Sequence, residues 1–208
     1  MDKPGQVQYD PRPVSRRQPQ RHYSLDEYFA VETDSLVKHE YYGGEIFAMA
    51  AASLAHNHVS ANVLALLRLG LRGSGCNAFG SDLRIHTPSG LYTYPDVSVI
   101  CGPVELLSGR PDTATNPVLL VEVLSTATRD YDAGEKFGLY KACTTFREYL
   151  LIEPERVSAE QWQLKRGGRW VLKTHHRRDA AVKLSSVPAE LPLAEVYREV
   201  MIAGSPIA

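Results

Sequence analysis

The segment from Val118 to Leu124 is apolar on both faces of a strand except at one position, Glu122. A strand that is apolar at successive positions is typical of the centre of a sheet covered on both sides. An unpaired charge in such a place costs several kcal/mol, so Glu122 needs a cation, a network of hydrogen-bond donors or a bound metal. Taken alone, this residue is explained more readily by a structural ion pair, or by a protonated carboxyl group bonded to a neighbour, than by a functional site.

The patterns on either side of this strand predict an α/β protein. Ser53 caps a long helix of regularly spaced apolar residues, and Asp132 with Glu135 opens another that runs to about Cys143. Strands at 79–85 and 94–101 precede the central strand, a loop covers 102–117, and a further strand covers 148–152. The core order is therefore helix, three strands, helix, strand, with one crossover between parallel strands. We expect a mixed sheet flanked by helices.

Further elements lie on both sides of this core. Ser24 and Glu27 have the spacing of a capping box at the start of a short helix, and Gly43-Gly44 is typical of a hairpin turn. Toward the C-terminus, Gly167-Gly168 marks a second hairpin and a final helix starts near Pro192. Residues 1–22 are rich in Pro, Gln and Arg, so we expect a flexible N-terminal arm followed by a single domain over 23–208.

The composition excludes several classes of protein. The 23 Lys and Arg residues nearly balance 24 Asp and Glu residues, which argues against a chain that coats nucleic acid by charge alone. The three cysteines, Cys76, Cys101 and Cys143, form no CxxC pair, so we expect free thiols in a reducing cytoplasm. No apolar run approaches the ~18 residues of a membrane span, and the N-terminus lacks the apolar core of a secretory signal. The sequence predicts a cytoplasmic protein with no membrane partner.

Two more residues make a functional interpretation of Glu122 stronger. Asp96 stands at the start of another apolar strand, and two neighbouring carboxylates repel each other unless a proton or cation lies between them. Lys136 is expected in the first turn of the helix that follows the Glu122 strand, at the sheet edge where α/β proteins build their sites. Each has an ordinary alternative, a turn carboxylate for Asp96 and a solvated or ion-paired lysine for Lys136.

Together, Pro95-Asp96, Glu122-Val123-Leu124 and Lys136 resemble the PD-(D/E)XK nuclease superfamily, whose core has the same order of elements. A longer match, from about Tyr23 to Tyr197, resembles the Uma-type family of bacterial restriction-endonuclease-like proteins. It rests on the segments Tyr23–Tyr28, His39–Ile46, Ala55-His56-Asn57, Tyr94–Val97, Glu122–Ser125 and Glu135-Lys136-Phe137. The chain departs from the superfamily pattern at Leu124, where a lysine is usual, and the resemblance suggests that Lys136 supplies this amine from the helix.

The resemblance implies a metal-dependent endonuclease that hydrolyses phosphodiester bonds. Asp96 and Glu122 would hold Mg²⁺ (or Mn²⁺), since oxygen ligands suit these ions, and the Val123 carbonyl would complete the shell. The ion would lower the pKa of a bound water, and Lys136 would orient that water. His56 would contact the water or the phosphate, or else bond to the backbone or a neighbour. Asp82 would join the acidic cluster, or else pair with Arg84 or water.

A basic segment follows the core at residues 165–178. Its basic residues are Lys165, Arg166, Arg169, Lys173, Arg177 and Arg178. A hairpin that also carries Trp162 and Trp170 could lie against the phosphate backbone of DNA, or form a charged edge that discourages strand pairing between molecules. The resemblance also implies a homodimer. The alternative function is a catalytically inactive nuclease fold that acts as a nucleic-acid-binding or assembly module.

Overall fold

The fold is described from a computed structural model, which covers residues 21–49 and 51–202 of the chain. The expected flexible arm falls almost wholly on residues 1–20, outside the described ranges. The backbone divides into two compact units, one up to Ala50 and one from Ala51 onward.

The first unit holds one helix and one hairpin. Helix α1 (Leu25–Asp34) begins at the predicted capping box, in which the Ser24 hydroxyl accepts from the Glu27 amide and the Glu27 carboxylate accepts from the Ser24 amide. Strands β1 (His39–Tyr42) and β2 (Glu45–Ala48) pair antiparallel around Gly43 and Gly44, both at positive φ. The predicted N-terminal hairpin is confirmed.

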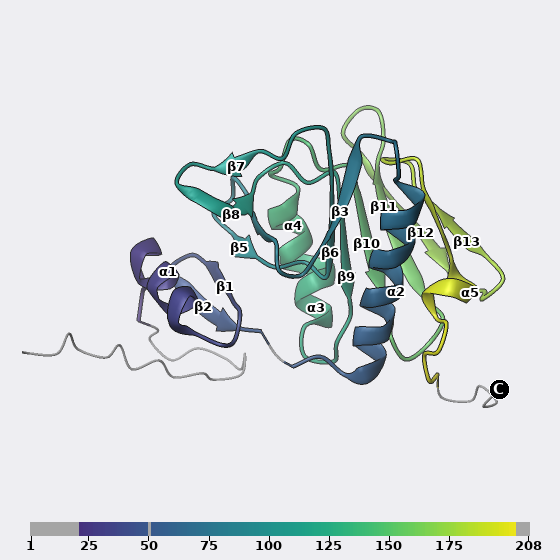
Figure 1. The fold of residues 1–208 in the computed structure, drawn as a ribbon, viewed down its shortest axis with the longest axis horizontal. Coiled ribbons are helices and arrows are strands. Elements are labelled where there is room, and N and C mark those ends of the chain that lie inside the picture. Colours follow the sequence, from purple (N-terminus) through teal and green to yellow (C-terminus); the bar gives the residue numbers. More distant parts are fainter. Residues whose placement is uncertain (1–20, 50, 203–208) are drawn as a thin grey trace, which may run out of the picture. The chain divides into compact units, whose positions relative to one another are not determined.

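The second unit is built on a six-stranded mixed sheet of order β12-β11-β10-β9-β6-β3 (Figure 1). Strands β9 and β10 are parallel and the other neighbours are antiparallel. The predicted central strand is β9, and all five of its residues are buried. The strands are β3 (Cys76–Gly80), β6 (Val97–Cys101), β9 (Leu119–Val123), β10 (Glu148–Ile152), β11 (Ala159–Leu164) and β12 (Trp170–His175).

Helices cover both faces of this sheet, as predicted (Figure 1). Helix α2 (Leu54–Gly70) packs Val59, Val63 and Leu67 against the odd-numbered residues of β9 and against Leu150 and Ile152 of β10. The opposite face meets the helix between β9 and β10, where the ring of Phe137 stacks on Tyr149 at 5.0 Å. Because strand side chains alternate between faces, Glu122 points toward this second helix and not toward α2.

The helix between β9 and β10 begins earlier than predicted. It consists of α3 (Arg129–Tyr131), a π-helical turn η1 (Asp132–Lys136) and α4 (Phe137–Tyr140). The prediction that Asp132 opens the helix was wrong. The helix begins at Arg129, and the Asp132 carboxylate contacts the Lys136 amine one turn later instead of capping the start of the helix. Lys136 therefore lies in the second turn, and π-helical turns of this kind are frequent at functional sites.

The region between β3 and β9 also differs from the prediction. The expected strand 79–85 is divided between β3 and β4, and the expected strand 94–101 starts only at Val97. The expected loop 102–117 contains two strands. These short strands form a second sheet in the order β5-β4-β8-β7 within this unit, namely β4 (Arg84–His86), β5 (Tyr92–Thr93), β7 (Leu106–Leu107) and β8 (Arg110–Ala114).

The C-terminal part confirms the predicted hairpin and final helix. The hairpin is β11–β12, and the helix is the short α5 (Leu193–Val196), which begins after Pro192. Strands β13 (Ala181–Lys183) and β14 (Glu190–Pro192) form a separate pair. Of the helices within the described ranges, none is long and apolar enough to cross a membrane.

The prediction of three free thiols was wrong for two of the cysteines. Cys76 of β3 and Cys101 of β6 stand directly opposite each other in the sheet and form a disulfide. Strand register brought together residues that are 25 positions apart, which spacing in the sequence does not reveal. Cys143 is free and buried, as predicted.

Candidate active site

Asp96 and Glu122 meet at one edge of the main sheet. Val97 of β6 pairs with Val121 of β9, so the next positions outward along the two antiparallel strands are Asp96 and Glu122. The Val123 amide donates to Asp96 Oδ2 over 2.7 Å, which ties the Asp96 carboxylate to the end of β9. The sheet therefore brings together the two carboxylates that were predicted to converge.

Glu122 is buried and has two donors on the neighbouring helix. Its Oε1 accepts from the Tyr140 hydroxyl over 2.7 Å and lies 3.0 Å from Lys136 Nζ. Burial raises the pKa of Glu122 to about 8; the Lys136 charge opposes this shift, while the charges of Asp132 and Asp96 add to it. The carboxyl group thus holds a proton to unusually high pH in the absence of another cation.

Lys136 lies between two carboxylates. Its Nζ is 3.3 Å from Asp132 Oδ1, one helical turn earlier, in addition to its contact with Glu122. The carbonyl of Asp132 accepts from the Tyr149 hydroxyl over 3.0 Å, which anchors this turn to strand β10. Lys136 is only 4% exposed, so its amine is held inside the site and not in solvent.

His56 approaches the same edge from the start of α2. Its Nε2 lies 3.2 Å from Asp96 Oδ2, and its Nδ1 lies 3.4 Å from the Ser60 hydroxyl. Burial lowers the pKa of His56, but the hydrogen bond and charge of Asp96, with a further hydrogen bond to Val123, outweigh burial and leave the pKa above its ordinary value. His56 therefore contacts a neighbouring side chain, which was one of its two predicted roles, and this neighbour, Asp96, is itself a predicted site residue.

The donor set of this edge suits a hard divalent cation. The two carboxylates supply oxygen ligands, and a cation there would favour the ionised form of Glu122 against the burial and the neighbouring negative charges that raise its pKa. Within residues 21–49 and 51–202, no group of three or more His, Cys, Asp or Glu side chains forms a ready-made metal cluster. The oxygen atoms of Asp96 and Glu122 are of the kind that Mg²⁺ takes, an ion that is usually held by one or two carboxylates and keeps several waters.

Asp82 lies in a turn and not in the strand where it was predicted. Strand β3 ends at Gly80, and Asp82 is exposed in the turn that follows, although this turn is at the same edge because Gly80 pairs with Val97. Its placement in a strand was wrong, and its role as a metal ligand stays a prediction.

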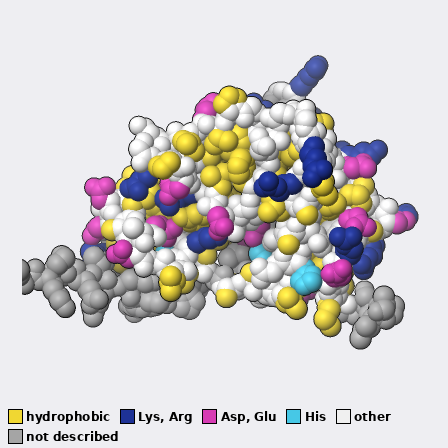
Figure 2. All heavy atoms as spheres, in the orientation of Figure 1, with side chains coloured by type: hydrophobic (Ala, Val, Ile, Leu, Met, Phe, Trp, Pro, Cys, Tyr) yellow, Lys and Arg dark blue, Asp and Glu magenta, His cyan; other side chains and the backbone are white. Residues whose placement is uncertain are grey.

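The predicted basic hairpin is divided between the two ends of the sheet. Thr174 of β12 lies on the same register row as Glu122, whereas Trp170 lies four residues away, or about 13 Å along the strand. The β11–β12 turn, with Lys165, Arg166 and Arg169, is therefore at the end opposite the carboxylates. Figure 2 likewise shows Lys and Arg in several separate groups on the face drawn, with acidic side chains among them.

The basic residues after Trp170 lie nearer the carboxylate row. Lys173 precedes Thr174 in β12, Arg177 pairs with Asp179, and Arg178 donates to the carbonyl of Tyr197 over 3.0 Å.

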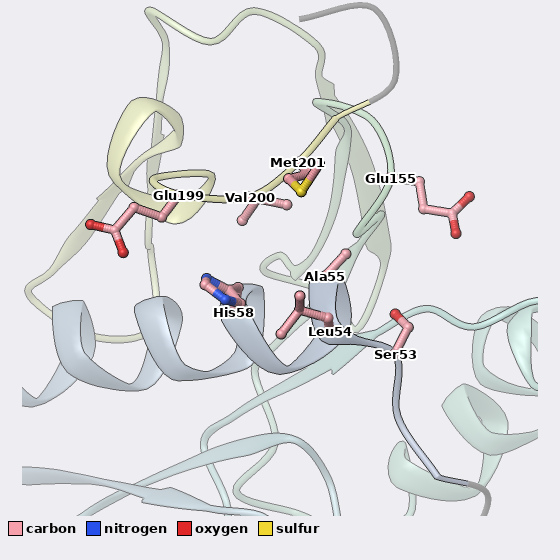
Figure 3. A pocket seen from close by; sticks show the side chains of 8 residues that line it. All are labelled: Ser53, Leu54, Ala55, His58, Glu155, Glu199, Val200 and Met201. Atoms are coloured by element: carbon pink, nitrogen blue, oxygen red, sulfur yellow. The ribbon is translucent and has the colours of Figure 1, made fainter. Parts of the chain in front are cut away.

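A pocket lies beside the start of α2, and neither Asp96 nor Glu122 lines it. It encloses about 570 Å³ and is lined by apolar side chains such as Leu54 and Met201 together with His58, Glu155 and Glu199 (Figure 3). His58 lines this pocket, whereas His56, two residues earlier on the helix, contacts Asp96. The predicted site residues do not line this pocket.

Sequence reasoning missed two residues of the site, Asp132 and Tyr140. Both are four positions from Lys136, and residues four apart lie on one face of a helix. This spacing could have placed both residues beside Lys136, since the predicted helix already ran from Asp132 to about Cys143.

The fold and the family match identify a restriction-endonuclease-like protein. A crystal structure from Anabaena variabilis, described as a putative nuclease belonging to DUF820, has the same fold with a TM-score of 0.68 at 16% identity, and the match covers 85% of this chain and 98% of that one. Residues 25–194 match the Uma2 family, described as "Putative restriction endonuclease", and the chain belongs to this family. Two uncharacterised Synechocystis proteins are also similar. They are slr1290, 34% identical over 84% of this chain and 91% of its own length, and sll1609, 34% identical over 76% and 90%.

Proposed function

We propose that the protein is a metal-dependent endonuclease that hydrolyses phosphodiester bonds of DNA. The observation that carries this proposal is the meeting of Asp96 and Glu122 at one sheet edge, with the Lys136 amine 3.0 Å from Glu122. Two carboxylates at the ends of adjacent strands, with an amine from the neighbouring helix beside them, are groups that can hold a metal ion and position a water for phosphodiester hydrolysis.

Each side chain has a distinct role in this proposal. Asp96, Glu122 and the Val123 carbonyl would hold Mg²⁺ or Mn²⁺, which supplies a water of lowered pKa and neutralises charge on the phosphate. The two carboxylates of Asp132 and Glu122 fix the position of the Lys136 amine, which orients the attacking water and stabilises its developing charge. His56 orients Asp96 through the 3.2 Å contact.

Cleavage of plasmid DNA by variants of the site tests the proposal. Glu122→Gln and Asp96→Asn keep the size of each side chain but remove its charge, so both should abolish Mg²⁺-dependent cleavage. Glu160→Gln is a matched control, because Glu160 lies on the same register row two strands from Glu122. Equal cleavage by all three variants and the wild-type protein would identify a contaminating nuclease.

The same preparation decides the alternative function. A catalytically inactive binding module predicts that the wild-type protein binds DNA without turnover and that Glu122→Gln binds it equally well.

A further inference from the structure

A group of charged side chains outside the catalytic residues lies at the same edge of the sheet. Glu153 directly follows β10, whose Leu151 pairs with Glu122 and whose Ile152 pairs with Val123. Since Leu151 and Glu153 are two positions apart, Glu153 points to the same face as Glu122. From the spacings of a parallel sheet, the two Cα atoms are about 8 Å apart.

Glu153 holds two arginines. Arg129, the first residue of α3, binds both carboxylate oxygens of Glu153 through its two terminal nitrogens, the second over 2.6 Å. Arg156 Nη2 binds Glu153 Oε1 over 3.1 Å. The Glu153 side chain is 9% exposed, whereas those of Arg129 and Arg156 are 41% and 71% exposed.

The turn that carries Glu153 and Arg156 is fixed to the core. The Glu153 amide donates to the Ser158 carbonyl over 3.0 Å, which closes the turn. The buried Tyr197 hydroxyl lies 2.8 Å from the Glu153 carbonyl and accepts from the Ser158 amide. The backbone of this turn therefore has a fixed position, and the Glu153 carboxylate joins both guanidinium groups to it.

This arrangement leaves positive charge and hydrogen-bond donors available at the edge. Two arginines on one carboxylate leave a net charge of about +1. Each guanidinium has about five N–H donors, of which the bonds described use two in Arg129 and one in Arg156. An exposed ion pair such as Arg156–Glu153 adds little to folding stability, whereas the planar fork of arginine matches the oxygens of a phosphate.

We propose that Arg129 and Arg156 form a binding site for a backbone phosphate of DNA, next to the phosphodiester bond that is cut. This inference rests on the proposed nuclease function and adds a site that positions the substrate. Glu153 lies on the same face as Glu122 with about 8 Å between their Cα atoms, so the two arginines that bind Glu153 stand beside the proposed catalytic residues, on the path of a phosphate that flanks the scissile one. Glu153 is a positioning residue, which holds both arginines toward the substrate.

The test is the affinity of a fluorescent DNA duplex, measured by anisotropy over a series of salt concentrations. Glu122→Gln serves as the background, so that the duplex is not cleaved during the measurement. Arg156→Gln should lower the affinity roughly 5-fold and reduce the slope of log K against log salt by about 1. Arg198→Gln is a matched control, since Arg198 also forms an exposed pair with a glutamate three residues earlier.

Two further measurements separate failure of this inference from failure of the proposed function. Thermal unfolding of Arg156→Gln should match that of the background protein, so that a loss of affinity reports a lost phosphate contact. If the wild-type protein cleaves DNA but Arg156→Gln and Arg198→Gln bind with the same slope, the inference is overturned and the nuclease function stands. If the wild-type protein neither binds nor cleaves DNA, both are overturned.

Discussion

The buried carboxyl group of Glu122 should make the stability of the metal-free protein depend on pH. Burial, together with Asp132 and Asp96, raises the pKa of Glu122 from 4.5 to about 8 against the opposing charge of Lys136. Between these values the folded protein binds one more proton than the unfolded chain, because the unfolded carboxyl group has already ionised. The free energy of unfolding therefore falls as pH rises, by up to about 1.4 kcal/mol per pH unit.

The size of this effect follows from the shift. A carboxyl group whose pKa moves from 4.5 to about 8 loses roughly 5 kcal/mol of stabilisation across the whole window. This value is a ceiling, since Glu122 and Lys136 titrate as a pair. The contribution is fully present below pH ~4.5 and lost above pH ~8.

Urea unfolding in EDTA, from about pH 5 to about pH 8, measures this dependence. We expect the stability of the wild-type protein to fall across this range and that of Glu122→Gln to fall much less, because the amide cannot release a proton. Glu160→Gln should keep the wild-type slope. Equal slopes for the wild-type protein and Glu122→Gln would refute the assignment of the buried proton to this carboxyl group.

Three further predictions concern other residues. Tyr140→Phe removes the hydrogen bond to Glu122 but keeps the ring, so we expect divalent-cation affinity by calorimetry to fall about 10- to 100-fold; an unchanged affinity would contradict this role. Glu148→Ala should lower the free energy of unfolding by about 3 kcal/mol, measured in urea, since it leaves buried donors without their acceptor. These donors belong to Gln161, Gln163, Ser185 and Ser186, and a loss below about 1 kcal/mol would contradict this role of Glu148. Burial raises the pKa of Cys143 to about 11, so a thiol reagent at neutral pH should find no reactive thiol in the folded protein, one after unfolding and three after reduction; three without reduction would exclude the disulfide.

The sequence predicted those parts of the fold that depend on local patterns. The capping box at Ser24, the cap at Ser53 and the apolar strand around Glu122 are set by residues close together in the chain, and the structure has all three. The strands within 102–117 were missed because β7 has two residues, and β8 pairs with β4 almost thirty positions earlier. Neither has an alternating pattern long enough to be recognised.

The predicted site shows the same limit. Asp96 and Glu122 were found as charges in or beside apolar strands, and Lys136 as a lysine near the start of the following helix, and the structure brings the three together. The π-helical turn was not predicted, and one of its contacts is not local, because the Asp132 carbonyl accepts from Tyr149, 17 positions along the chain in β10. Arg129 and Glu153 are 24 residues apart, and only the parallel pairing of β9 and β10 brings them to one edge.

The central claim is that Asp96 and Glu122 act together on a divalent cation. Calorimetric titration of Mn²⁺ and Mg²⁺ into the wild-type protein, Asp96→Asn, Glu122→Gln and Glu160→Gln tests this claim most directly. The account predicts binding by the wild-type protein and Glu160→Gln, and its loss in Asp96→Asn and Glu122→Gln. Binding that is absent from the wild-type protein, or equal in all four proteins, would show that the two carboxylates have only a structural role.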